Sequence, residues 1–165
     1  MQPLQIKAFL PVAVAALLSV ASLCQEPERQ PWTQTPEGFV IASLGAHYEY
    51  KAVSPDGSAL GVRFRENTEQ GSLSYWTEVF LLEMVEAKNY RLIAKKDVTS
   101  ADGVPGQALT FEVAQGNVPY HYGLAVFVTE KSIVTLESGT ELEALSRYEA
   151  AFSSALAALR VKTYE

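Results

Sequence analysis

The chain has 165 residues, a length that fits one domain, and its formal net charge is −6. Binding to a nucleic-acid backbone requires clustered Lys and Arg, and the sequence contains no basic stripe, so we exclude a nucleic-acid partner. The same lack of basic clusters gives no support for polybasic attraction to anionic lipids.

Residues 1–24 have the pattern of a secretory signal peptide. A short leader carries one positive charge, Lys7, and the 16 residues from 8 to 23 are apolar or small apart from two serines. A transmembrane anchor needs about 20 apolar residues. This run is shorter, contains Pro11 and is followed by no basic stop-transfer cluster. We therefore expect an exported protein, with an uncleaved anchor or a core helix as the alternatives.

The only cysteine, Cys24, lies where the apolar run ends and a polar stretch begins. A lone cysteine cannot form an internal disulfide. Its position resembles the lipid-modified first residue of a bacterial lipoprotein, although Ala21 and Leu23 stand where that signal prefers leucine and a small residue. Lipidation at Cys24 would anchor the protein to a membrane by burying methylene groups, each contributing roughly 0.8 kcal/mol. The alternative is cleavage after Ala21, which would give a soluble periplasmic or secreted protein.

A linker and a hairpin are predicted to follow. Residues 25–37 hold three prolines among polar residues, a composition too poor in apolar side chains to fold alone, so we predict a flexible linker there. The folded domain is then expected over residues 38–162. Its first elements are predicted strands at 39–42, 47–53 and 60–65, the last two joined by a turn at 54–57.

The spacing of apolar residues predicts a helix over residues 72–89. Trp76, Phe80 and Met84 lie along one face of it, and Leu82 and Val85 widen that face. We interpret Trp76 as a packing residue between the helix and a sheet. A serine at 72 or 74 is the expected N-cap, because its hydroxyl can accept a hydrogen bond from a free N–H of the first turn.

A four-stranded meander is predicted across residues 92–136, followed by a C-terminal helix. Its strands are expected at 90–98, 109–113, 120–129 and 133–136. Residues 124–128 are apolar without interruption, which predicts a central strand covered on both faces. The helix is expected over residues 140–159, with Thr140 and Glu143 forming a capping box at its start.

Short catalytic motifs are missing from the sequence: there is no nucleophile elbow, no His-Glu-x-x-His, no phosphate loop and no Gly-x-Gly-x-x-Gly. His47 and His121 with Glu49 make only a weak metal signal, and we interpret both histidines as strand residues that face solvent or are hydrogen-bonded. Turn formation explains loop acids such as Asp56 and Asp102. We therefore expect no catalytic residue, metal or cofactor, and predict that the protein is not an enzyme.

Tyr120, His121 and Tyr122 form the candidate binding surface, and the alternative is that the rings of Tyr120 and Tyr122 fill the space between helix and sheet. They begin a strand beside a loop, and tyrosine combines a large apolar ring with a polar tip that suits partner and ligand surfaces. Glu137 comes just after the last predicted strand. We interpret it as a solvated residue before a turn, with a buried acid as the alternative.

The order of elements is a strand, a hairpin, a helix, a four-stranded meander and a long helix, preceded by a signal segment and Cys24. This order resembles the PsbP-like fold and the small DcrB-type bacterial lipoproteins that share it. The resemblance covers most of residues 35–161. It is carried by the Trp76 helix, the Asp102-Gly103-x-x-Gly106 loop before Leu109-x-Phe111, the strand at 124–128, and the helix with Phe152 and Leu156. It implies a single α+β domain in which a twisted, mainly antiparallel sheet packs against two helices. It also implies a non-enzymatic accessory subunit or envelope lipoprotein.

Our functional expectation is an exported, membrane-anchored lipoprotein of the cell envelope that binds or supports an envelope protein whose identity is unknown. The alternative is a soluble periplasmic domain that binds a small ligand in a pocket between sheet and helix. A hydrolase has the least support, because the sequence shows no convergent set of polar groups.

Overall fold

The computed structural model describes residues 31–42 and 48–164. The signal segment, Cys24, the first part of the predicted linker and His47 therefore lie outside the described residues. Within the described ranges, no helix is long and apolar enough to cross a bilayer.

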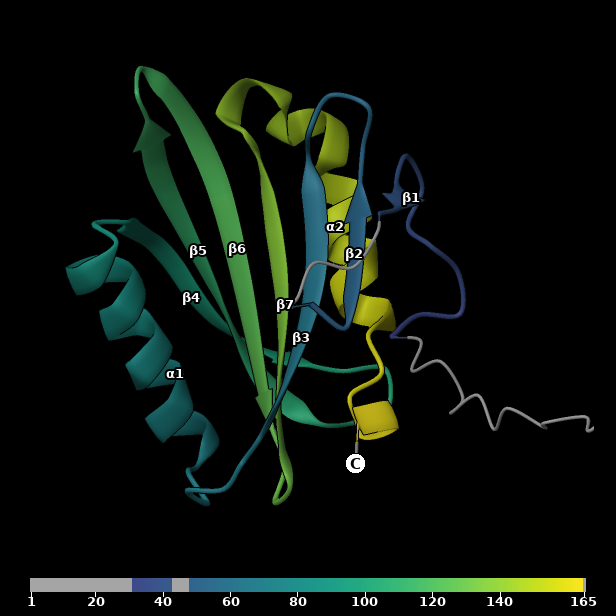
Figure 1. The fold of residues 1–165 in the computed structure, drawn as a ribbon, viewed down its shortest axis with the longest axis vertical. Coiled ribbons are helices and arrows are strands. Elements are labelled where there is room, and N and C mark those ends of the chain that lie inside the picture. Colours follow the sequence, from purple (N-terminus) through teal and green to yellow (C-terminus); the bar gives the residue numbers. More distant parts are fainter. Residues whose placement is uncertain (1–30, 43–47, 165) are drawn as a thin grey trace, which may run out of the picture.

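In this part of the chain, seven strands form one antiparallel sheet with the order β1-β2-β3-β7-β6-β5-β4 (Figure 1). The strands are β1 (Val40–Ile41), β2 (Tyr50–Val53), β3 (Ala59–Glu66), β4 (Arg91–Thr99), β5 (Pro105–Gln115), β6 (Val118–Val128) and β7 (Ser132–Glu141). The predicted meander is confirmed as β4 to β7. Its last strand, β7, pairs with β3 over the whole length of β3, so the meander and the N-terminal hairpin form a single sheet.

The two helices cover opposite faces of the sheet. Helix α1 (Leu73–Leu82), extended by the π-helical turn η1 (Glu83–Ala87), packs on one face, and α2 (Leu145–Ala158) packs on the other (Figure 1). Side chains alternate between the faces along β6: Leu124 and Val126 pack with α1, whereas Ala125 and Phe127 pack with α2. The central strand covered on both faces is therefore confirmed.

Helix α1 begins and ends as its residues suggest. Ser72 is the N-cap, and its hydroxyl accepts a hydrogen bond from the N–H of Tyr75 at 3.2 Å. Asn89 follows the last turn with a φ of 57°, a left-handed conformation that asparagine tolerates. Trp76 is buried and donates its indole N–H to Asn67 at 2.9 Å, which confirms its packing role. The apolar face is narrower than predicted, because Leu82 is 51% exposed.

The predicted capping box at Thr140 is wrong. Strand β7 pairs with β6 as far as Glu141, so the backbone at Thr140 belongs to the sheet. The Thr140 hydroxyl is buried and lies 2.8 Å from the hydroxyl of Ser58. A 3-10 turn, η2 (Leu142–Ala144), follows, and α2 begins at Leu145 without a side-chain cap. Pairing with a neighbouring strand thus replaces the local cap.

Part of the predicted linker belongs to the domain. Trp32 is only 3% exposed, and its indole N–H donates to the carbonyl oxygen of Ala155 at 2.6 Å. That carbonyl lies in the last turn of α2, where no intrahelical donor remains. The carbonyl of Pro31 also accepts a hydrogen bond from the N–H of Arg160. One buried tryptophan therefore fixes residues 31–37 to the end of α2, despite their polar, proline-containing composition.

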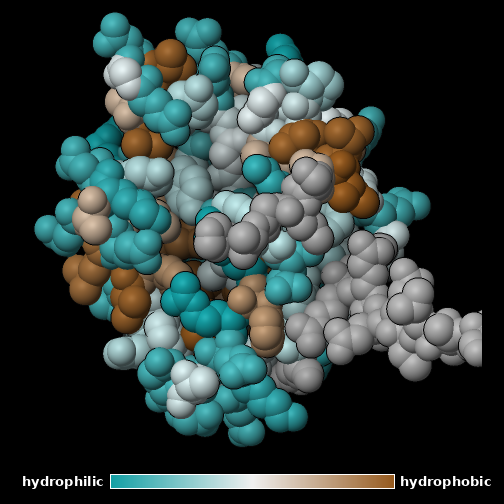
Figure 2. Space-filling model, in the orientation of Figure 1, coloured by the Kyte–Doolittle hydropathy of each residue, from teal (hydrophilic) through white to brown (hydrophobic). Residues whose placement is uncertain are grey.

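The outer surface in the orientation of Figure 1 is mostly hydrophilic, as Figure 2 shows. Exposed apolar surface is visible beside β1 and over α1. The large apolar side chains that are exposed on these two elements are Val40 and Ile41 of β1, and Tyr75 and Leu82 of α1.

Candidate functional site

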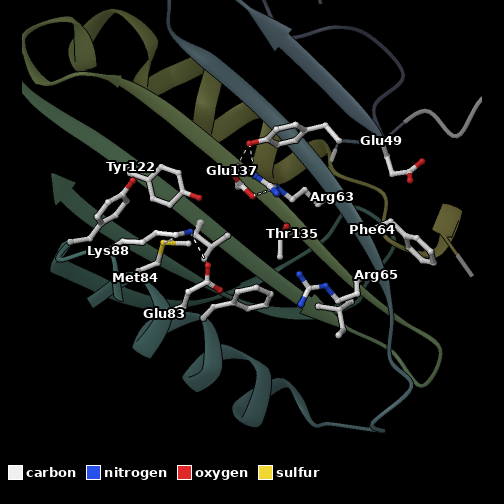
Figure 3. A pocket seen from close by; sticks show the side chains of 15 residues that line it. Glu49, Arg63, Phe64, Arg65, Glu83, Met84, Lys88, Tyr122, Thr135 and Glu137 are labelled. Atoms are coloured by element: carbon white, nitrogen blue, oxygen red, sulfur yellow. Dashed lines mark hydrogen bonds and ion pairs between the residues drawn. The ribbon is translucent and has the colours of Figure 1, made fainter. Parts of the chain in front are cut away.

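A cleft of about 570 Å³ lies between α1 with η1 and the strands β3, β7 and β6 (Figure 3). Its lining is Tyr48, Glu49, Arg63, Phe64, Arg65, Phe80, Glu83, Met84, Lys88, Tyr90, Tyr122, Leu124, Ile133, Thr135 and Glu137.

Strand register brings the polar groups of the cleft floor together. Arg63 of β3 lies directly opposite Thr135 of β7, and Leu124 of β6 lies opposite Glu137 on the other side of β7. Residues two apart on a strand face the same side, so Arg65 joins Arg63 on this floor. Figure 3 shows Thr135 between the two arginines. Val62 packs in the core on the α2 side, so Arg63 and Arg65 lie on the opposite face of the sheet, which α1 covers.

Glu137 is the centre of a hydrogen-bonded network. Its side chain is 14% exposed, and its Oε1 lies 2.6 Å from Nε of Arg63. Its Oε2 accepts a hydrogen bond from the Tyr48 hydroxyl at 3.0 Å, while Arg63 donates to the Tyr48 oxygen at 2.7 Å. The interpretation of Glu137 as a solvated turn residue was wrong, because β7 continues past this position and turns its side chain towards Arg63.

Tyr48 reaches this network because Gly61 leaves room for its ring. A Cβ at position 61 would lie 2.4 Å from the Cε1 of Tyr48. The ring therefore lies on the bare backbone of β3, and the guanidinium of Arg63 lies 4.2 Å from its centroid. Tyr48 precedes β2, and its hydroxyl bonds to Glu137 on the α1 side of the sheet.

Both tyrosines beside Glu137 are held in the neutral form. Burial, and then the charge of Glu137, raises the pKa of Tyr48. The same two causes raise the pKa of Tyr122, which also lines the cleft. Burial, the largest single influence, would lower the pKa of Arg63, but the charge of Glu137 and the interactions with Tyr48 together outweigh burial, and the pKa is raised. The network thus consists of a carboxylate, a permanent cation and the neutral phenol donor of Tyr48, with the neutral phenol of Tyr122 lining the same cleft.

The helix side of the cleft combines apolar and charged groups. Phe80 and Met84 are buried, and they form an apolar wall. Lys88 and Glu83 form an ion pair of 2.8 Å in which both side chains are nearly half exposed. The guanidinium of Arg65 lies 6.0 Å from the centroid of the Phe80 ring.

The structure divides the predicted surface of Tyr120, His121 and Tyr122 between the two faces of the sheet. Tyr122 lines the cleft, while Tyr120 bonds to Glu141 at 3.3 Å. His121 lies on the α2 side, stacked on Phe152 with centroids 6.2 Å apart, and lines a smaller pocket of about 170 Å³. Burial lowers the pKa of His121. A role of these residues in binding a partner stays a prediction.

No group of three or more His, Cys, Asp and Glu residues that could hold a metal ion occurs within residues 31–42 and 48–164. His47, one of the two histidines weighed as ligands, lies outside these ranges.

Comparison with known proteins shows the fold but no sequence family. No protein-family model matches the chain, and no curated protein sequence matches it. Three solved structures are similar in fold. The cyanobacterial PsbP (CyanoP) of Synechocystis sp. PCC 6803 has a TM-score of 0.56 and 16% identity over 76% of this chain and 83% of its own. LpqN, which is involved in cell envelope biogenesis of Mycobacterium tuberculosis, has a TM-score of 0.60 and 11% identity over 77% of this chain and 82% of its own.

The third structure is PA94, a protein of unknown function from Pseudomonas aeruginosa, with a TM-score of 0.50 and 13% identity over 79% of this chain and 85% of its own. The chain has a PsbP-like fold. The predicted fold class, one α+β domain with a mainly antiparallel sheet packed against two helices, is confirmed. At these identities the likeness shows the fold alone, so function has to be argued from the site.

Proposed function

We propose that this protein is an exported, non-enzymatic binding domain that holds a small molecule in the cleft between α1 and the sheet. The observation that carries the proposal is the cleft itself. Its volume of about 570 Å³ lies within the range of roughly 300–1,000 Å³ that is usual for ligand sites, and its mainly polar lining faces the apolar side chains of Phe80 and Met84. Our leading expectation from the sequence was a partner-binding lipoprotein, and this geometry favours the ligand-binding alternative.

The state of the polar groups supports binding rather than catalysis. General acid–base chemistry works best with a group that titrates near the working pH. Tyr48 and Tyr122 have pKa values raised further from neutrality. The oxygens of Glu137 are already occupied by Arg63 and Tyr48, so they have little capacity to accept a substrate proton. These groups are suited to orient a ligand.

Nuclear magnetic resonance with a compound collection tests this function. A ligand that occupies the cleft should shift the amide signals of residues 63–65, 83–88 and 133–137, the segments that carry lining residues of the sheet and of the helix. It should also raise the melting temperature, because it binds only the folded state. Ligands that bind but shift only signals around the smaller α2-side pocket would refute the assignment to the cleft.

The envelope location is the second part of the proposal. The signal pattern and Cys24 support export and lipidation, and the fold shared with LpqN, a protein of cell envelope biogenesis, agrees with this location. Assignment to the DcrB-type lipoproteins belongs to the same proposal. The test is the intact mass of the mature protein from a membrane fraction, compared with Cys24→Ala. A mature chain that begins at a diacylated Cys24 supports the tether, whereas an unmodified chain that begins at Ser22 contradicts it.

Partner binding remains a second candidate function, favoured by the edge strand β4. Only β5 pairs with it among the described residues, and it exposes Leu92 and Ile93 by 38% and 44%. Exposed sheet edges are common docking sites for proteins. Partner capture should be compared between Ile93→Lys and the double variant Tyr120→Ala with Tyr122→Ala. If both capture the partner as the parent does, neither surface is the docking site.

A further inference from the structure

The charges in the middle of the cleft do not cancel. The described residues place three cations in its lining, and two of these are paired: Arg63 with Glu137 and Lys88 with Glu83. Arg65 has no carboxylate within ion-pair distance among the described residues. The remaining acid of the lining, Glu49, is exposed and lies apart from Arg65 at the edge of the cleft (Figure 3). The floor therefore carries an uncompensated positive charge.

Hydrogen-bonding capacity on the floor is also unbalanced. A guanidinium has five N–H donors and no acceptor. Those of Arg65 make no hydrogen bond within the described part of the chain, and its contact there is with the ring of Phe80. The acidic oxygens of the floor, by contrast, belong to Glu137 and are already bonded. A ligand that completes this floor must supply acceptors, and a negatively charged acceptor forms the strongest such bonds.

Apolar surface lies within reach of this charge. The ring of Phe80 lies beneath the guanidinium of Arg65, and Met84, Leu124 and Ile133 continue the lining. A cavity of roughly 150 Å³ accepts one benzene ring. The cleft of about 570 Å³ therefore has room for a charged head and a body of more than one ring.

We infer that the ligand of the cleft is an organic anion, with a carboxylate, sulfonate or phosphate head at Arg65 and Thr135 and an apolar body against Phe80 and Met84. This inference rests on the proposed function and specifies the ligand class. Arg65 supplies the charge, and Thr135, which lies between the two arginines, supplies a hydroxyl donor (Figure 3). The ion pair between Arg63 and Glu137 joins β3 and β7, the two strands that carry Arg65 and Thr135.

Two matched dyes test the inference. 8-Anilinonaphthalene-1-sulfonate has an aromatic body and a sulfonate, whereas N-phenyl-1-naphthylamine has the same rings without the charge. We expect the sulfonate to bind the full mature chain at least about tenfold more tightly, which corresponds to about 1.4 kcal/mol. Its binding should shift amide signals of residues 63–65 and 133–137.

Arg65→Gln is the decisive variant, because Arg65 is exposed and its removal should leave the fold intact. We expect it to weaken binding of the sulfonate about tenfold and to leave binding of the neutral dye unchanged. Arg160→Gln is the matched control: it removes an exposed arginine remote from the cleft lining and should change neither affinity. Thr135→Val should weaken the sulfonate alone by a few-fold.

The outcomes separate the two proposals. If both dyes bind in the cleft with equal affinity and Arg65→Gln changes neither, the ligand is not an anion, while the proposed binding function stands. If the sulfonate dye shifts no amide signal of the cleft residues, the inference is overturned. The proposed function is then tested by the nuclear magnetic resonance experiment with the compound collection. If Arg65→Gln and Arg160→Gln weaken the sulfonate equally, its attraction is a general charge effect and the inference is also overturned.

Discussion

Trp32→Ala is the substitution that most directly tests whether residues 31–37 belong to the folded domain. The Trp32 side chain is 3% exposed, and its ring packs edge-to-face on the ring of Tyr50, with the two ring centroids 4.8 Å apart. Its indole N–H bonds to the carbonyl of Ala155 at 2.6 Å. Truncating a buried tryptophan to alanine usually costs about 3–5 kcal/mol. We expect a loss of about 4 kcal/mol in the free energy of unfolding.

Urea unfolding followed by circular dichroism measures this loss. With an m-value of about 2 kcal/mol per molar urea, the midpoint should fall by about 2 M. Trp32→Phe keeps a ring but removes the donor to the Ala155 carbonyl, so it should cost only about 1–2 kcal/mol. Thr33→Ala, an exposed position in the same segment, is the control and should change stability by less than about 0.5 kcal/mol.

A loss below about 1 kcal/mol for Trp32→Ala would refute this reasoning. It would mean that the segment contributes almost nothing to the fold and acts as the flexible tether that its composition suggests. An equal loss in Trp32→Ala and Trp32→Phe would instead assign the stabilisation to the hydrogen bond at the end of α2, and not to the buried ring.

Three further predictions follow from the described contacts. Hydrogen bonds from Ser54 and then Tyr148 lower the pKa of Asp56 to about 2 from its ordinary value of 3.8, so the stability it contributes is present above about pH 4 and lost as the pH falls towards 2. Urea unfolding between pH 5 and 2 should show this loss in the parent and a flatter profile in Asp56→Asn; parallel profiles would contradict it. Asn89 has a φ of 57°, a left-handed conformation that is unfavourable for alanine and free of strain for glycine. In thermal unfolding, Asn89→Ala should therefore lower the free energy of unfolding by about 1 kcal/mol, while Asn89→Gly should leave it unchanged or raise it. Equal effects of the two substitutions would rule out backbone strain at this position. Arg63→Gln and Glu137→Gln should each cost about 1–3 kcal/mol, and because each leaves the other without its partner, the double variant should cost about 1 kcal/mol less than their sum. Strict additivity would show that the pair contributes nothing to stability.

The Arg63–Glu137 pair also links the stability of the domain to the cleft. A half-exposed arginine regains water when its partner is lost, so the pair contributes less than a fully buried one. Its larger role is geometric, because it holds Tyr48 and the two strands in one arrangement. Variants of this pair are therefore expected to disturb ligand binding more than they disturb folding.

The sequence by itself determined the elements whose signals are local. Alternation in residues 60–65 and 109–113 specified strands, and Trp76, Phe80 and Met84 specified the buried stripe of α1. The uninterrupted apolar run at 124–128 even specified a strand covered on both faces. These signals succeed because a strand or helix repeats every two or 3.6 residues, and each turn of the meander joins strands that are neighbours both in sequence and in space.

Only the tertiary structure decided the position of the cleft and the roles of Glu137, Trp32 and Thr140. Glu137 meets Arg63 and Tyr48 across sequence separations of 74 and 89 residues, and Trp32 meets Ala155 across 123. Such contacts depend on strand register and on which helix covers which face, and composition or periodicity specifies neither. For this reason the sequence led us to interpret Glu137 as a solvated residue, Trp32 as part of a linker and Thr140 as a helix cap. Each of these residues has polar or proline-containing neighbours in the sequence. The environment of each in the fold is formed by residues far along the chain.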